Sequence, residues 1–240
     1  MISITGLSKS YNKGAVKAVD NLNMHINHGE IFGFLGPNGA GKTTTIKMMI
    51  GLLNPDSGSI IINGHDIQRN PLDAKRDIGY VPDNPDVYDR LTGIEYLNFM
   101  ADVYEVPADI RKERIKYFLD IFELADAAKD LIKSYSHGMR QKIVLTGALI
   151  HDPAVWILDE PMVGLDPKSS HLLKELMRKH CEKGNTVFFS THVLEVAEKL
   201  CDRIGIIHKG KLIAVGTMDE LRQGDNAGSL ENIFLELTEK

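Results

Sequence analysis

The sequence predicts an α/β protein with a largely parallel sheet, an N-terminal antiparallel β portion and an inserted helical segment. Short β-rich runs recur along the chain and helical patterns fill the intervals between them, which is the layout of a largely parallel sheet. These runs cover residues 31–36, 59–62, 77–82, 155–160 and 186–192. Strand signals are missing from residues 84–150, where apolar residues repeat with the helical period.

The composition excludes several classes of protein. The 240 residues include 28 Lys+Arg and 33 Asp+Glu, giving a formal charge of −5, with 43% apolar and 25% charged residues. These values are typical of a soluble globular domain and argue against a disordered, fibrous or membrane-embedded chain. The mildly acidic balance argues against a domain that binds a nucleic-acid backbone, because such domains usually carry a net basic face.

The expected location is the cytoplasm. No apolar run approaches the roughly 18 residues of a membrane span, and the N-terminus lacks the layout of a signal peptide. We therefore expect contact with a membrane only through a partner. Cys181 and Cys201 lack the spacing of a metal or redox motif, which predicts buried free thiols in a reducing compartment.

The first clear helix follows a glycine-rich loop and places four apolar residues on one face: Ile46, Met49, Ile50 and Leu53. The turn-forming residues 54–58 should end it. Near the end of the chain, residues 203–208 and 211–216 flank Lys209-Gly210 and predict a hairpin. A last helix with Leu230, Ile233, Phe234 and Leu237 on one face follows a loop over residues 223–229, and it packs on the core or on a partner.

The helical segment over residues 84–150 shows two clear periodicities. One contains Ile94, Leu97 and Asn98, and the other contains Ile115, Phe118, Leu119 and Phe122. We predict a single domain in which residues 1–83 and 151–215 form the α/β core. Residues 84–150 form an inserted helical subdomain, and residues 216–240 form a C-terminal helical extension.

Residues 36–43 fit the phosphate-binding pattern GxxxxGK[ST], between an apolar strand and a helix. Glycines let successive backbone N–H groups turn inward around phosphate oxygens, and the helix N-terminus and Lys42 add positive charge. Thr43 is a candidate Mg²⁺ ligand. The predicted phosphate-binding residues are Gly36, Pro37, Asn38, Gly39, Ala40, Gly41, Lys42, Thr43 and Thr44. The alternative is a glycine-rich turn with an incidental lysine, which the strand and helix around the motif disfavour.

Asp159 and Glu160 end an apolar strand. In an open parallel sheet, ligands gather at the carboxyl ends of the strands. There, Asp159 could hold Mg²⁺ and Glu160 could orient and deprotonate an attacking water. A strand that ends in Asp-Glu is commonplace by itself, and the phosphate loop is what makes this pair a predicted catalytic site.

Residues 135–141 read Tyr-Ser-His-Gly-Met-Arg-Gln and lie about 20 residues before the Asp-Glu strand. With the motifs above, this segment resembles the signature LSGGQ of the nucleotide-binding subunits of ATP-binding-cassette (ABC) transporters. The resemblance covers nearly the whole chain and implies a RecA-like P-loop NTPase core. It also implies that Ser136 and Gly138 contact the γ-phosphate of ATP bound to a second copy. His137 departs from the usual Gly, and Ser136 alone could simply cap a helix.

Four further positions match the family's order. Tyr11 resembles the aromatic residue that stacks on adenine, and His192 resembles the switch histidine that reaches the γ-phosphate. Asp166 lies in a Gly-Leu-Asp-Pro segment that resembles the one communicating across the dimer. Asp83 stands where the family usually has a Gln that touches Mg²⁺ and the attacking water, so its position matches but its residue type does not.

The resemblance implies an ATPase with catalytic residues Glu160, His192 and Lys42, and with Mg²⁺ held by Thr43, Asp159 and Asp83. Two copies, or one copy and a related subunit, would enclose two ATP molecules and drive a transmembrane permease, with residues 84–100 as the docking surface. The subunit would then be peripheral on the cytoplasmic face of the membrane. Similarity to bacterial exporter subunits favours export. The substrate cannot be read from this chain, because its site lies in another polypeptide.

Two other functions share some of these motifs. A cytosolic ABC-type ATPase that acts on ribosomes or DNA usually carries two cassettes or a long coiled coil, and 240 residues contain neither. A P-loop kinase needs an acceptor site and a lid, which would leave the signature segment unexplained.

Overall fold

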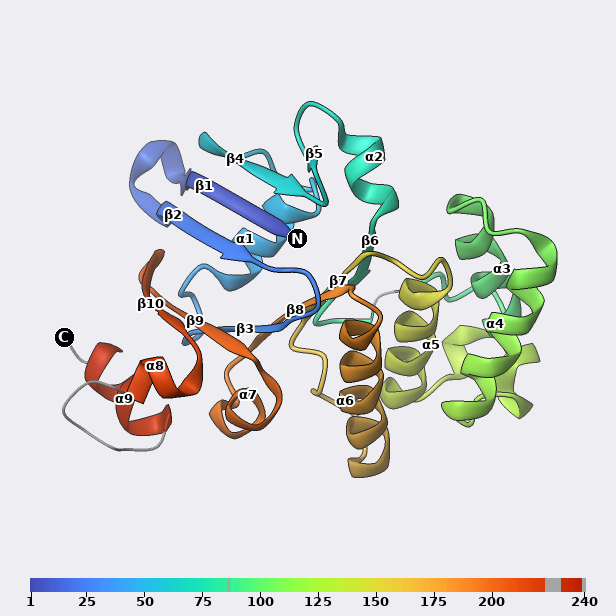
Figure 1. Cartoon of the computed structure of the whole chain (residues 1–240). Coiled ribbons are helices and arrows are strands. Elements are labelled where there is room, and N and C mark those ends of the chain that lie inside the picture. The colour runs from blue at the N-terminus through green and yellow to red at the C-terminus, as the bar shows by residue number, and fades with distance from the viewer. Residues whose placement is uncertain (86, 223–229, 239–240) are drawn as a thin grey trace.

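The computed structural model describes residues 1–85, 87–222 and 230–238, and it contains two sheets and a group of helices (Figure 1). Sheet A lies beside sheet B, and helices α3, α4 and α5 group at the far edge of sheet B (Figure 1). This is an α/β fold with an antiparallel N-terminal sheet and a mostly parallel central sheet. The predicted fold class is therefore confirmed.

Sheet A is antiparallel and has the strand order β2-β1-β4-β5. Its strands are β1 (Ile2–Tyr11), β2 (Val16–Ile26), β4 (Ser57–Ile62) and β5 (His65–Asp66). We expected residues 59–62 to belong to the largely parallel sheet, and that expectation was wrong. Ile60 and Ile62 are fully buried whereas Ile61 is 36% exposed, so β4 buries one face only, as strands of antiparallel sheets commonly do.

Sheet B has the order β10-β9-β3-β8-β7-β6, and only the β9–β10 pair is antiparallel. Its strands are β3 (Ile31–Leu35), β6 (Ile78–Val81), β7 (Val155–Asp159), β8 (Thr186–Thr191), β9 (Arg203–His208) and β10 (Lys211–Gly216). The hairpin predicted around Lys209-Gly210 is confirmed. Every residue of β3, β7 and β8 is buried, as expected for parallel strands covered on both faces.

Alternate residues of β7 and β8 divide the interior into two cores. Val155, Ile157 and Phe188 face a core shared with sheet A and helix α1 (Lys42–Met49). Trp156 and Phe189 face a second core, which the helices on the other side of the sheet complete. Successive side chains of a strand point to opposite faces of the sheet. One face of β7 and β8 therefore packs against α1, which lies between sheet B and sheet A.

Helix α1 ends earlier than we expected. Its last helical residue is Met49, and Gly51 has a φ of +66°. The Leu52 N–H donates to the Lys47 carbonyl at 2.9 Å and the Gly51 N–H to the Met48 carbonyl at 3.1 Å, the pair of bonds that closes a helix with a left-handed glycine. Leu53 consequently lies outside the helix.

The segment that we expected to be helical contains α3 (Gly93–Val103), α4 (Ala108–Ile121) and α5 (His137–Leu149), with short 3₁₀ turns at Asp126–Lys129 and Ile132–Ser134. The remaining helical elements are the 3₁₀ turn Asn12–Gly14, α2 (Pro71–Arg76), α6 (Pro167–Glu182), α7 (Leu194–Leu200), α8 (Met218–Arg222) and α9 (Leu230–Thr238). A Thr92–Glu95 capping box begins α3, because each side chain accepts from the other residue's backbone N–H.

The last helix packs on this chain. Leu230 is fully buried and Ile233 is 9% exposed, and Leu230 joins Leu35 and Ala197 in a third apolar cluster. The expected loop over residues 223–229 lies outside the described residues, as does the side chain of Leu237. Cys181 and Cys201 are free thiols, and burial raises the pKa of Cys181 to about 12.

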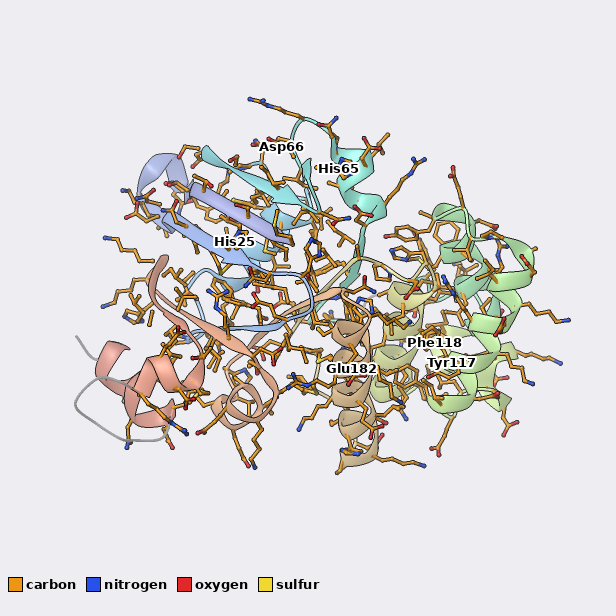
Figure 2. All side chains as sticks on the ribbon, in the orientation of Figure 1. His25, His65, Asp66, Tyr117, Phe118 and Glu182 are labelled. Atoms are coloured by element: carbon orange, nitrogen blue, oxygen red, sulfur yellow. The ribbon has the colours of Figure 1, made fainter. Side chains whose placement is uncertain are left out.

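Two histidines, the buried His180 and the half-buried His151, lie where the helices meet sheet B. His151 stacks on Tyr104 with ring centroids 3.6 Å apart, and its Nε2 lies 3.2 Å from the Ile78 carbonyl. His180 of α6 meets Trp156 edge-on and lines a small cavity with Tyr117 and Phe118, which Figure 2 labels on α4. Burial lowers the pKa of both histidines to about 4.

Stability should therefore fall in mild acid. The folded pKa values of about 4 lie below the ordinary value of 6.5, so between these values the unfolded chain binds more protons and the free energy of unfolding decreases as the pH falls. Each histidine can contribute roughly 3 kcal/mol across this window. We predict that His180→Leu flattens the pH dependence of urea unfolding below pH 6.5. The exposed His171→Gln on the same helix is the control, and equal slopes in the two variants would contradict the prediction.

Candidate functional site

A cavity of about 210 Å³ opens where β3, β6 and β7 end. The predicted phosphate loop forms one wall, and three carboxylates face it. The lining residues are Ala18, Pro37, Asn38, Gly39, Gly41, Lys42, Thr43, Thr44, Asp83, Asp159 and Glu160. The parallel register of sheet B therefore brings together residues that lie more than 100 positions apart in the chain.

The loop between β3 and α1 needs glycine at specific positions. Gly41 has a φ of +111°, and a Cβ there would come within 3.0 Å of the Ala18 carbonyl oxygen. A Cβ on Gly36 would come equally close to the Ile207 carbonyl oxygen. Glycine is therefore required at position 41 for its positive φ, and at positions 36 and 41 because neighbouring backbone atoms leave no room for a Cβ. Gly36 and Ala40 belong to the loop but do not line the cavity.

Lys42 is held inside this loop. Its side chain is only 7% exposed, and Nζ donates to the Gly36 carbonyl at 2.7 Å and to the Pro37 carbonyl at 3.4 Å. Nζ also lies 3.7 Å from Glu160 Oε1. The ammonium group therefore lies on the inner side of the loop, where it can meet an anion that enters the cavity.

Asp159 is almost completely buried, with 1% of its surface exposed. It accepts hydrogen bonds from the Ser190 hydroxyl and from Thr43 Oγ1, the latter at 3.0 Å. Burial raises its pKa despite these two hydrogen bonds, and the charges of Asp83 and Glu160 add to the effect. Among the described residues, no Lys, Arg or His nitrogen lies within 4.0 Å of this carboxylate.

Glu160 lies between two nitrogen groups. One carboxylate oxygen faces Lys42, and Oε2 lies 3.0 Å from His192 Nδ1, a contact that requires a proton on Nδ1 when the carboxylate is ionised. Its backbone has a φ of +47°, and its N–H donates to the Ser190 carbonyl and hydroxyl oxygens, each at 3.2 Å. This unusual backbone turns the side chain from the strand into the cavity.

Asp83 lines the cavity and also caps a turn, since its Oδ1 accepts from the Asn84 N–H at 2.8 Å. Its negative charge is close enough to help raise the pKa values of Asp159 and Tyr80. The carboxylate of Asp83 can therefore face the cavity and accept the Asn84 N–H at the same time.

Four predicted site residues lie away from the cavity. Tyr11 is 40% exposed at the end of β1, and Ser136 caps α5 by accepting from the Met139 N–H at 3.3 Å. Gly138 lies in the first turn of that helix. Asp166 caps α6, and the hydroxyl and N–H of Ser169 hold the pKa of Asp166 below its ordinary value.

Ser190 was not among the predicted site residues. This hydroxyl donates to Asp159 and accepts from the Glu160 N–H, so it joins the two acidic residues. The polar Ser190 directly after the apolar run of residues 187–189 was the available signal. Ala18 also lines the cavity, and its carbonyl oxygen packs against Gly41. Its residue type could not predict this role, because the contact depends only on how β2 approaches the loop.

The comparisons with known proteins give the same assignment. The family model for ABC transporters matches residues 19–163. The chain is 40% identical over 221 residues to the linearmycin resistance ATP-binding protein LnrL of Bacillus subtilis (strain 168), covering 92% of this chain and 70% of that protein. The chain belongs to the ABC transporter family.

Solved ABC structures share its fold. One ATP-binding subunit of an ABC transporter superposes with a TM-score of 0.94 at 35% identity and covers 99% of both chains. An ATP-binding cassette solved as a dimer in a post-hydrolysis state with ADP and phosphate has a TM-score of 0.82 at 25% identity, covering 91% of this chain and 99% of that one.

This ABC protein is an ATP-binding subunit that hydrolyses ATP for transport. ATPase subunits of the family form dimers and work with a membrane permease. In the described part of this subunit, no helix has the length and apolar character needed to span a membrane.

Asp83 should slow the isolated ATPase. A carboxylate about 4 Å from a γ-phosphate charge is repelled by about 4 kcal/mol at an effective dielectric of 20, before any cation offsets part of it. We predict that Asp83→Gln raises the steady-state ATPase rate at equal Mg²⁺ and without a permease. Asp83→Asn removes the charge at nearly constant length and so separates charge from reach. Unchanged rates in both variants would remove Asp83 from the mechanism.

Proposed function

We propose that this ABC subunit powers export, that two copies enclose two ATP molecules, and that Mg²⁺ is required. The observation that carries the proposal is the contact of Glu160 with both Lys42 and His192 at the mouth of the phosphate-loop cavity. One carboxylate there meets a buried cation and an imidazole. This arrangement can bind the terminal phosphate and activate a water beside it.

The phosphates would lie in the loop formed by residues 36–44. Its backbone N–H groups and the N-terminus of α1 favour an anion, and Lys42 can exchange its loop carbonyls for phosphate oxygens. Glu160 would orient and deprotonate the water, while His192 would hold the carboxylate at Nδ1 and reach the γ-phosphate. This assignment gives Glu160, His192 and Lys42 the catalytic roles.

The residues around Asp159 suit Mg²⁺. Among the described residues, no group of three or more His, Cys, Asp or Glu could hold a metal ion without another ligand. Mg²⁺ in phosphate sites commonly uses one or two carboxylates, a hydroxyl and the substrate's own oxygens. The buried Asp159, its neighbour Thr43 and the nearby Asp83 provide this set, and no cationic side chain in the described part of the chain pairs with Asp159. The ion would neutralise charge on the β- and γ-phosphates.

The second copy would complete each site. Ser136 and Gly138 begin α5 outside their own cavity, and a helix N-terminus favours phosphate. Tyr11 would stack on adenine at the edge of sheet A, and Asp166 would lie at the seam between copies. The partner copy can be identical or a related subunit.

We also propose a location and a direction of transport. The subunit would lie on the cytoplasmic face of the membrane, bound to its permease through residues 84–100, where Tyr88 and Phe99 are exposed and meet edge-on at 5.6 Å. The similarity to LnrL, a linearmycin resistance protein by name, supports export. The family match and the high structural similarity to a transporter subunit disfavour a ribosome- or DNA-acting ATPase and a kinase.

Loss of the proposed base should separate binding from hydrolysis. Glu160→Gln keeps the shape of the side chain but removes the proton acceptor, so we expect ATP hydrolysis to fall by about 10² to 10⁴-fold while ATP binding persists. ATP should then hold the variant as a stable dimer in gel filtration. Glu195→Gln, at an exposed i,i+4 pair on α7, is the control. Hydrolysis by Glu160→Gln at the parental rate would exclude Glu160 as the base.

A bulky cation at the signature segment should block assembly. We predict that Ser136→Arg abolishes ATP-driven dimerisation but leaves nucleotide binding by the monomer intact, because Lys42 and the loop are unchanged. Ser136→Ala is the matched control, since it loses the helix cap, at about 1 kcal/mol, without adding bulk. Equal loss of monomer affinity in Ser136→Arg would mean that the segment is merely structural.

A further inference from the structure

His137 makes an unusual contact for a residue in the signature segment. It is exposed at the first position of α5, and its ring lies directly against the backbone of Gly164. A Cβ built on Gly164 would come within 3.0 Å of the Cδ2 and Nε2 atoms of the ring. The imidazole therefore occupies the space that a side chain at position 164 would need.

Gly164 lies in the middle of a short segment, residues 161–166, that follows Glu160 directly. Glu160, the residue before the segment, has a φ of +47°, and the segment ends at Asp166, the cap of α6. Its backbone conformation therefore helps to determine where the Glu160 carboxylate points. Gly164 itself has a φ of +80°, so the turn at this position already depends on glycine.

Helix α5 holds this segment at three places. The Gln141 amide donates to the Pro161 carbonyl at 3.5 Å, and Lys142 Nζ lies 3.4 Å from Asp166 Oδ2. His137 covers Gly164 between them. Gln141 and Lys142 fix the two ends of the segment, whereas His137 is the contact at its centre and the one nearest to Ser136.

We propose that His137 is a positioning residue for Glu160 in its own chain. Its contact with Gly164 holds residues 161–166 in a fixed position relative to the N-terminus of α5. A shift of that helix end would therefore move the Glu160 carboxylate. This inference rests on the proposed roles of Ser136 and Glu160. It implies that engagement of Ser136 by the second copy's nucleotide changes the hydrolysis step in the chain that supplies Ser136.

A double-mutant cycle tests the contact. In the parent, Gly164→Ala should lower kcat by at least about tenfold, because the new Cβ would push the imidazole off Gly164 and break the positioning contact. In a His137→Gly background the space is free and only the strain at positive φ remains, so the same change should cost at least about threefold less. Additive effects would overturn the proposal.

A second set of variants, all at position 137, tests the same contact if the Gly164→Ala protein does not fold. His137→Gly should lower kcat and reduce the cooperativity of the rate with ATP concentration, while nucleotide affinity of the monomer stays constant. His137→Phe keeps a ring over Gly164 and should restore both quantities. Restoration by His137→Ala as fully as by His137→Phe would overturn the packing role.

The Glu160→Gln variant separates a failure of the proposed function from a failure of the positioning role of His137. If Glu160→Gln abolishes hydrolysis while the His137 cycle is additive, the proposed function stands and the positioning role of His137 fails. If Glu160→Gln hydrolyses at the parental rate, the proposed function itself fails. Thermal unfolding of each variant checks that changes in kcat do not come from a partly unfolded protein.

Discussion

Because β3, β7 and β8 pair in parallel and in register, their carboxyl ends meet at one edge of sheet B, and the proposed catalytic residues depend on that alignment. The phosphate loop leaves β3, the two acidic residues end β7, and His192 follows β8. A shift of one residue in the β7–β8 register would turn Asp159 away from Ser190 and into an apolar core. The two cores on opposite faces of these strands make such a shift costly.

The electrostatics of the cavity explain why it suits a nucleotide with a metal ion. Three carboxylates, Asp83, Asp159 and Glu160, face one buried ammonium group, Lys42. Such a site carries excess negative charge, and the charges of Asp83 and Glu160 add to the burial that raises the pKa of Asp159. Phosphates alone would increase the repulsion, whereas the proposed Mg²⁺ would offset it. The balance of charge thus supports joint binding of ATP and Mg²⁺.

The sequence was most informative where chemistry and local geometry coincide. The glycine and lysine pattern of residues 36–43 predicted a phosphate loop between a strand and a helix, and the observed loop has that context. The buried strands were predicted because runs that are apolar on both faces leave a strong signal. Errors came where the signal is weak. Residues 60–62 are three isoleucines in succession, so the one-sided burial of this strand in sheet A could not be predicted. The role of Gly51 in ending α1 was overlooked.

By itself, the sequence determined the phosphate-loop and Asp-Glu motifs, because the chemistry of glycine, lysine and paired carboxylates follows from the residue type. It also determined the order of the main strands and helices, because their apolar periodicities can be read along the chain. Only the tertiary structure decided which side chains meet. Ser190 joins Asp159 to Glu160, and His137 covers Gly164, because strand pairing and helix packing bring these distant residues within contact distance. Such contacts depend on angles and separations between elements, which a single sequence does not specify.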